Sequence, residues 1–168
     1  MNECMKKAFL ILAAVLGLSV AASAQSKAVG ARLGTGLEAS YQHWVGDPNF
    51  IEITAGMNFI DALTFRATGT YNWMLWEPDW TPRGNWGVYA GPGVTIGSRA
   101  DKKEDGTIGF PAMYGVVAQL GLEYTFWFPL QLSVDLRPIL FGYSENFFSD
   151  CSNPVNILIP TISARYAF

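Results

Sequence analysis

The sequence is poor in cysteine and histidine, which limits the chemistry available to it. Its cysteines are Cys4 and Cys151, and its one histidine is His43. A single histidine excludes a metal centre built from several histidine ligands, and we expect no cofactor. Basic residues are also scarce, since eleven lysines and arginines stand against fourteen acidic residues. Because nucleic-acid binding requires a basic face, we expect no nucleic-acid partner.

The only long apolar run lies at the N-terminus. Ala8 to Val20 is a run of thirteen residues that follows Lys6 and Lys7, and the small residues Ala22-Ser23-Ala24 come after it. The run is shorter than the roughly twenty residues that a membrane-spanning helix needs. A basic start, a short apolar run and a small-residue cleavage site are the parts of a signal peptide. We therefore predict a cleaved signal peptide over residues 1–24.

Cleavage before Gln25 leaves one domain of residues 25–168, which we expect to be exported. Without the charges of the signal peptide this domain has nine basic and thirteen acidic residues, a net charge of −4. Its only cysteine is Cys151, so no disulfide can form within it. It contains no run of about eighteen apolar residues, the usual mark of a membrane helix.

Apolar residues in this domain alternate with small or polar ones. A period of two is typical of β-strands with two different faces. The alternating segments are 28–42, 50–59, 63–75, 86–97, 112–126, 130–141 and 156–168. Turn-forming sequences rich in glycine, proline, asparagine and aspartate separate several of them. No window has a helical period, so the pattern predicts an all-β fold.

The polar face of these segments combines glycine with balanced charge. Its charged residues are four basic and four acidic: Arg32, Glu38, Glu52, Arg66, Glu123, Asp135, Arg137 and Arg165. Glycine weakens a strand. In the narrow interior of an eight-stranded barrel, however, small residues make space for large ones. We therefore predict a closed antiparallel transmembrane β-barrel whose lumen is plugged by these charges and whose apolar face meets lipid.

The aromatic residues favour the same arrangement. All six tryptophans lie at or near predicted strand ends, and membrane barrels concentrate aromatic residues in girdles at both interfaces. A soluble periplasmic lipid-binding barrel is the architectural alternative. It would turn the apolar face inward and the charged, glycine-rich face outward.

Several short motifs carry a family resemblance. They are Gly30-Ala31-Arg32-Leu33-Gly34, Gly121-Leu122-Glu123-Tyr124, the stretch from Pro129 to Pro138, and the aromatic end Tyr166-Ala167-Phe168. Together they resemble the small eight-stranded outer-membrane barrels of Gram-negative bacteria, of the type of outer-membrane proteins A and X. The resemblance implies an outer-membrane location, with Tyr166 and Phe168 as the signal read by the barrel-assembly machinery.

The alternating segments number seven, whereas bacterial single-chain barrels have an even number of strands. One segment must therefore form two strands, or one strand is missing from the count. We predict that Gly34-Thr35-Gly36 is a hairpin loop with a glycine in the left-handed region, so that Leu33 pairs with Leu37 and Ala31 with Ala39. An eighth strand near Ile139–Phe148 is the alternative.

The sequence favours a structural or interaction role for this barrel. Connectors 98–110 and 142–155 would lie outside the cell and could meet an envelope or extracellular partner. A narrow channel and a lipid-modifying enzyme remain alternatives. The enzyme would need His43 and a second polar group such as Ser40 on one rim, but residues three apart on a strand point to opposite faces.

Overall fold

The structure is a computed structural model that describes residues 27–46, 48–58, 63–102, 108–143 and 159–168. The predicted signal peptide and its cleavage site lie outside these residues. The strands are β1 (Lys27–Leu33), β2 (Gly36–Trp44), β3 (Phe50–Asn58), β4 (Thr64–Trp76), β5 (Asn85–Arg99), β6 (Asp101–Lys102), β7 (Ile108–Gly109), β8 (Ala112–Thr125), β9 (Gln131–Leu136), β10 (Ile139–Tyr143) and β11 (Thr161–Ala167). None of the described segments is a helix long and apolar enough to cross a membrane.

Eight antiparallel strands form a closed barrel, as the alternation predicts. Strands β1 to β5 pair in chain order, β5 pairs with β8, and β8 pairs with both β9 and β10. Strand β9 then pairs with β11, and β11 pairs with β1 to close the ring. At this junction the Lys27 N–H donates to the Phe168 carbonyl at 3.1 Å, and the Phe168 N–H donates to the Lys27 carbonyl at 2.8 Å.

Strands β9 and β10 act as one barrel strand with an interruption. They pair with successive stretches of the same edge of β8, and Arg137 and Pro138 lie between them. The Ala118 N–H donates to the Pro138 carbonyl at 3.0 Å, which keeps the two halves on β8. The alternative of an additional strand near Ile139–Phe148 is therefore wrong, since β10 continues a strand already counted.

The predicted hairpin between β1 and β2 is confirmed, with one correction. Leu33 pairs with Leu37, and Ala31 pairs with Ala39. The positive backbone φ angles of glycines in the described residues are those of Gly46 and Gly84, so the left-handed glycine expected at Gly34 or Gly36 is wrong. A Cβ added at Gly36 would overlap the carbonyl oxygen of Met57, so close contact with β3 is what requires glycine there.

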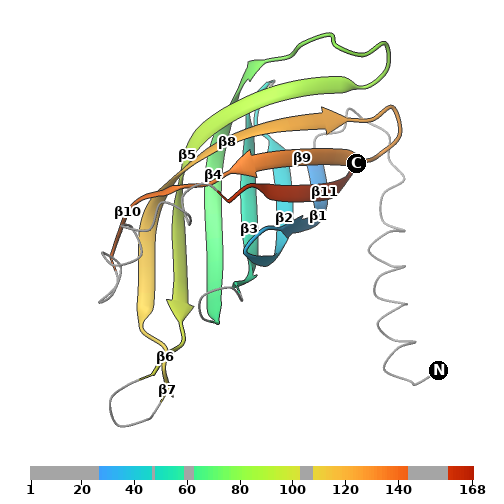
Figure 1. Ribbon diagram of the computed structural model, residues 1–168. Helices are drawn as coiled ribbons and strands as arrows, with labels where there is room; N and C mark the ends of the chain where they lie inside the picture. The colour runs from blue at the N-terminus through green and yellow to red at the C-terminus, as the bar shows by residue number, and fades with distance from the viewer. Residues whose placement is uncertain (1–26, 47, 59–62, 103–107, 144–158) are drawn as a thin grey trace, which may run out of the picture.

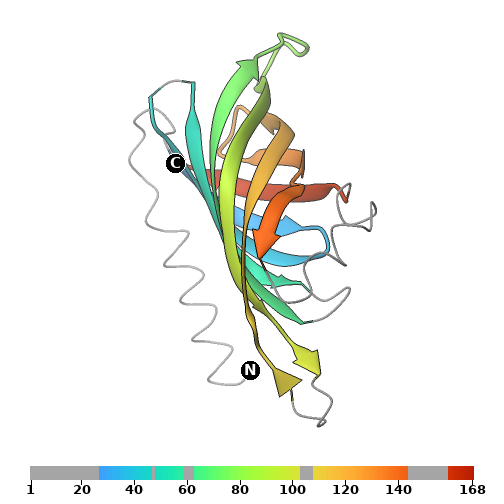
Figure 2. The ribbon, with the colours of Figure 1, turned by 90° about the vertical axis from the view of Figure 1, so that its left-hand side faces the viewer.

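The walls of the barrel differ in height. Strands β4, β5 and β8 have 13, 15 and 14 residues, whereas β1 and β11 have 7 each. Figures 1 and 2 show β5 and β8 running past the other strands towards β6 and β7. The predicted connector 98–110 is therefore partly ordered strand, with Ser98 paired to Ala112 and Lys102 to Ile108. Connector 142–155 begins within β10, and residues 144–155 lie outside the described residues.

The interior is polar and the outer surface is apolar. Among the described residues seventeen buried side chains are polar or charged, whereas the buried hydrophobic side chains are Ala28, Phe50, Tyr89, Val117 and Ala167. Large apolar residues face outward on short and long strands alike, for example Leu33 on β1 and Val94 and Ile96 on β5, each 62% exposed. The apolar-cored soluble barrel is therefore wrong, because its faces would have the opposite orientation.

The tryptophans gather at one end of the barrel, the end where Lys27 and Phe168 meet. Trp44 ends β2, and Trp73 and Trp76 lie in the last four residues of β4. Trp80 lies in the β4–β5 turn, Trp86 is the second residue of β5, and Trp127 lies in the turn after β8. The opposite end carries Phe65, Phe110, Tyr114 and Phe141 instead. Aromatic residues therefore lie at both ends of the barrel, with tryptophan at one end and phenylalanine and tyrosine at the other.

Close approach of β4 to β5 gives a test of this packing. A Cβ at Gly91 would overlap the Tyr71 carbonyl oxygen, whereas a Cβ at Gly69 meets nothing within 4 Å. We expect Gly91→Ala to destabilise the barrel by about 1–3 kcal/mol, the usual cost of overpacking. Gly69→Ala is the matched control and should leave the free energy of unfolding nearly unchanged. Urea titration of folded protein measures both, and equal stability of the two variants would contradict the assigned packing.

Candidate functional site in the barrel interior

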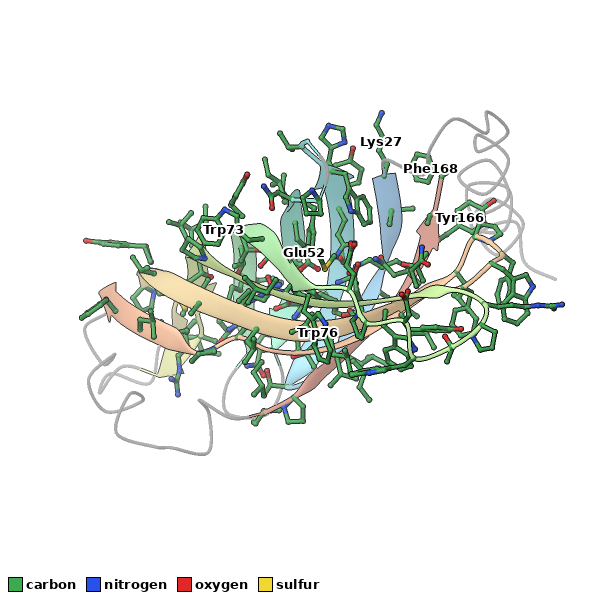
Figure 3. The ribbon with its side chains drawn as sticks, turned by 90° about the horizontal axis from the view of Figure 1, so that it is seen from above. Lys27, Glu52, Trp73, Trp76, Tyr166 and Phe168 are labelled. Atoms are coloured by element: carbon green, nitrogen blue, oxygen red, sulfur yellow. The ribbon has the colours of Figure 1, made fainter. Side chains whose placement is uncertain are left out.

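Glu52 on β3 is the centre of the charged interior. Its side chain is fully buried and lies inside the ring of strands (Figure 3). Arg32 donates to Oε1 at 3.0 Å, Arg137 approaches Oε2 at 3.2 Å, and Arg165 donates to Oε1 as well. One carboxylate therefore holds three arginines, which come from β1, from the break between β9 and β10, and from β11.

Two further carboxylates extend this network. Asp135 on β9 accepts a hydrogen bond from Arg32 at 2.6 Å. Glu38 on β2 accepts from Arg66 at 2.9 Å and lies 3.6 Å from both Arg32 and Arg137. Seven of the eight charges predicted to share the lumen are thus linked by ion pairs: Arg32, Glu38, Glu52, Arg66, Asp135, Arg137 and Arg165.

Neutral side chains that the sequence analysis did not assign to the site complete the network. Ser40 donates to Glu52 at 2.7 Å and accepts from Arg165 at 2.8 Å. Gln119 donates to Glu52 at 2.8 Å, and Ser133 accepts from Arg165 at 2.7 Å. These residues share the inward register of the charges on their strands, and this register was the available signal. Such bonds are needed because a buried charge is costly unless its remaining hydrogen-bonding positions are satisfied.

Glu123 on β8 stands apart from the other seven charges. It is 4% exposed, and among the described residues no arginine or lysine lies within ion-pairing distance of its carboxylate. Its hydrogen bond comes from Gln131 at 2.9 Å. This separation could not be predicted from the alternation, because Glu123 has the same inward-facing parity on its strand as the other charges.

Two cavities lie on either side of the network. A small one of about 20 Å³ is lined by Arg32, Glu38 and Arg66 among others, near the β1–β2 turn. A larger one of about 170 Å³ is lined by Glu123 and by Glu77 from the β4–β5 turn, at the end that carries the tryptophans. The ion pairs therefore fill the centre of the barrel, and open space lies towards its two mouths.

Ser40 and His43 lie on opposite faces of β2. Ser40 is buried inside, whereas the His43 ring stacks on the outward Tyr41 ring with centroids 6.5 Å apart. They therefore do not form a nucleophile and base pair, which requires hydrogen-bond contact. The described residues also hold no group of three or more His, Cys, Asp or Glu side chains that could bind a metal ion.

The difference between Glu52 and Glu123 predicts different costs of neutralising each. Glu52→Gln leaves three buried arginines without their shared carboxylate, so we expect a loss of about 3–5 kcal/mol in the free energy of unfolding. Glu123→Gln removes a charge without an ion-pair partner and should cost clearly less. Urea unfolding measured by tryptophan fluorescence tests this order, and the exposed Asp79→Asn is the control. A larger loss for Glu123→Gln would contradict Glu52 as the centre.

Comparisons with known proteins support the fold. No family model matches the sequence, and no curated protein matches it significantly. The structure is similar to that of the N-terminal β-barrel domain of Pseudomonas aeruginosa OprF, with a TM-score of 0.56 and 13% sequence identity. The match covers 84% of this chain and 95% of that chain. The expected likeness to small eight-stranded outer-membrane barrels is thereby confirmed for the fold.

Proposed function

We propose that the protein is an integral outer-membrane barrel of a Gram-negative bacterium, with a structural or interaction role and a plugged lumen. The inverted polarity of the barrel is the observation that carries this proposal. An apolar outer wall combined with a polar, hydrogen-bonded interior is stable in lipid, where every backbone group must be paired within the barrel. In water the same outer wall would be an aggregation hazard.

The turns suggest an orientation for this barrel. The end with Lys27 and Phe168 carries the β2–β3, β4–β5 and β8–β9 turns, which we assign to the periplasm. The opposite end carries the β5–β8 hairpin with its small β6–β7 ribbon and the connector after β10. We propose that these two outer segments, within the predicted 98–110 and 142–155, meet an envelope or extracellular partner.

The ion pairs favour a plug over an open channel. Arg32 alone contacts carboxylates on β2, β3 and β9, on both sides of its own strand, so its guanidinium lies within the lumen and occupies part of it. An ion passing through the centre would have to displace contacts that are mutually satisfied and buried, at a cost of several kcal/mol. A narrow channel is therefore the second candidate, and the separation of Ser40 from His43 leaves the lipid-modifying enzyme without a supporting arrangement.

Fractionation with heat modification tests the location. We expect the full-length chain, expressed in a Gram-negative host, to appear in the outer-membrane fraction. Its electrophoretic mobility in denaturing detergent should change after boiling, because a closed barrel resists the unheated detergent. Recovery in the soluble periplasmic fraction without a mobility change would contradict the proposal.

We also propose that Tyr166 and Phe168 form the signal read by the barrel-assembly machinery. Their rings lie side by side at the C-terminal end of β11, with centroids 6.5 Å apart and an interplanar angle of 27°. Phe168→Ala should lower the yield of inserted barrel in cells. It should leave urea stability after refolding in detergent nearly unchanged, because the backbone pairing of Phe168 with Lys27 needs no side chain. An unchanged cellular yield would refute this role.

A further inference from the structure

The cavity between Glu77 and Glu123 has no role in the plug. It has a volume of about 170 Å³ and opens at the end of the barrel where the chain ends meet. Two carboxylates line it, together with the neutral polar groups of Asn85 and Thr125, and no lysine or arginine is among its described lining residues. The cavity therefore has a net negative lining, unlike the small arginine-lined cavity at the opposite end.

The carboxylate of Glu123 points to a ligand for this cavity. The side chain is 96% buried and unpaired by any described cation, and Gln131 donates its only described hydrogen bond, to Oε2. The other three interior carboxylates each hold at least one arginine. The side-chain amide oxygen of the fully buried Gln131, the residue behind Glu123 that does not itself line the cavity, also has no hydrogen-bond partner. Arg165 acts on this carboxylate electrostatically but is ion-paired with Glu52. A buried carboxylate without its own ion pair is costly unless a positive group or a proton comes to it.

The remaining walls favour an organic ammonium over a metal ion. Trp44 and Met74 line the same cavity, and an aromatic face attracts a cation whose charge is spread over methyl or methylene groups. The Trp44 ring is fixed by packing on Phe50, with centroids 5.6 Å apart. A hard divalent cation would instead want six or more oxygen ligands. Only two carboxylates line the cavity.

We propose that this cavity is a binding site for a small soluble organic ammonium ion, held between Glu77, Glu123 and the ring of Trp44. Glu123 supplies the buried charge, and Glu77, on the exposed turn, supplies the charge at the mouth. Because Glu123 lies inside the ring of strands and Glu77 lies at the mouth of the cavity, a free amine reaches the site more directly than the headgroup of a lipid outside the wall.

The test titrates choline into the purified full chain in a maltoside detergent, which carries no ammonium group. The readout is the indole N–H resonance of Trp44 in a nitrogen–proton NMR spectrum, assigned by its disappearance in Trp44→Phe. We expect a saturable shift that sodium chloride at the same ionic strength does not produce. Glu123→Gln should weaken binding at least about tenfold, because it removes the buried negative charge that attracts the quaternary ammonium.

Two further variants keep the test decisive if Glu123→Gln does not fold. Glu77→Gln lies on an exposed turn outside the packed interior and should also weaken choline binding. Asp79→Asn removes a charge from the same turn but does not line the cavity, so it should bind like the unmodified protein. A shift that grows without saturation, or that is equal in all variants, overturns the proposal.

Two controls separate the ligand classes. Saturation by calcium chloride but not by choline would overturn the ammonium in favour of a metal ion. In lipid nanodiscs, a shifted Trp44 resonance with phosphatidylcholine but without added choline would overturn the soluble ligand in favour of a headgroup. The same resonance position in phosphatidylcholine and phosphatidylglycerol discs supports the soluble ligand.

Discussion

The ion pairs of Glu52 with three arginines are the interaction on which the arrangement of the other interior side chains depends. A guanidinium can be kept in a narrow interior only if a carboxylate faces it, and here Arg32, Arg137 and Arg165 converge on one. Their strands meet on both sides of the seam between β1 and β11. The side chains therefore join the two ends of the chain across the lumen, in addition to the backbone ladder that closes the ring.

Small residues around this network make the convergence possible. Glycines face the interior beside the large side chains, and at Gly30, Gly56 and Gly91 an added Cβ would overlap a neighbouring carbonyl oxygen. The strands can thus approach closely where the wall curves, while long arginines occupy the space that is left. Charge, glycine and alternation form one solution, since each would be unfavourable without the others.

The sequence predicted the features that depend on local pattern. The period of two gives the strands and their faces, and the pairing of Leu33 with Leu37 follows from keeping one apolar face. Features that depend on how all the strands are placed around the ring could not be predicted from the local pattern. The separation of Glu123 from the arginines depends on the relative stagger of β8, β9 and β11. The position of all the tryptophans at one end depends on which strand ends lie at the same end of the barrel. Glu77 lies in a turn, where alternation carries no information.

The unequal walls have a consequence for the lipid around the barrel. At about 3.3 Å per residue and a tilt of about 40°, the 15 residues of β5 rise roughly 38 Å and the 7 residues of β1 roughly 18 Å. The apolar band of such membranes is about 25 Å tall. A bilayer that surrounded this barrel would therefore be compressed beside the β1–β11 seam and relaxed beside β5. Its acyl chains would be shortest and least ordered along that seam, and this thinner region of lipid would move with the protein as it diffused.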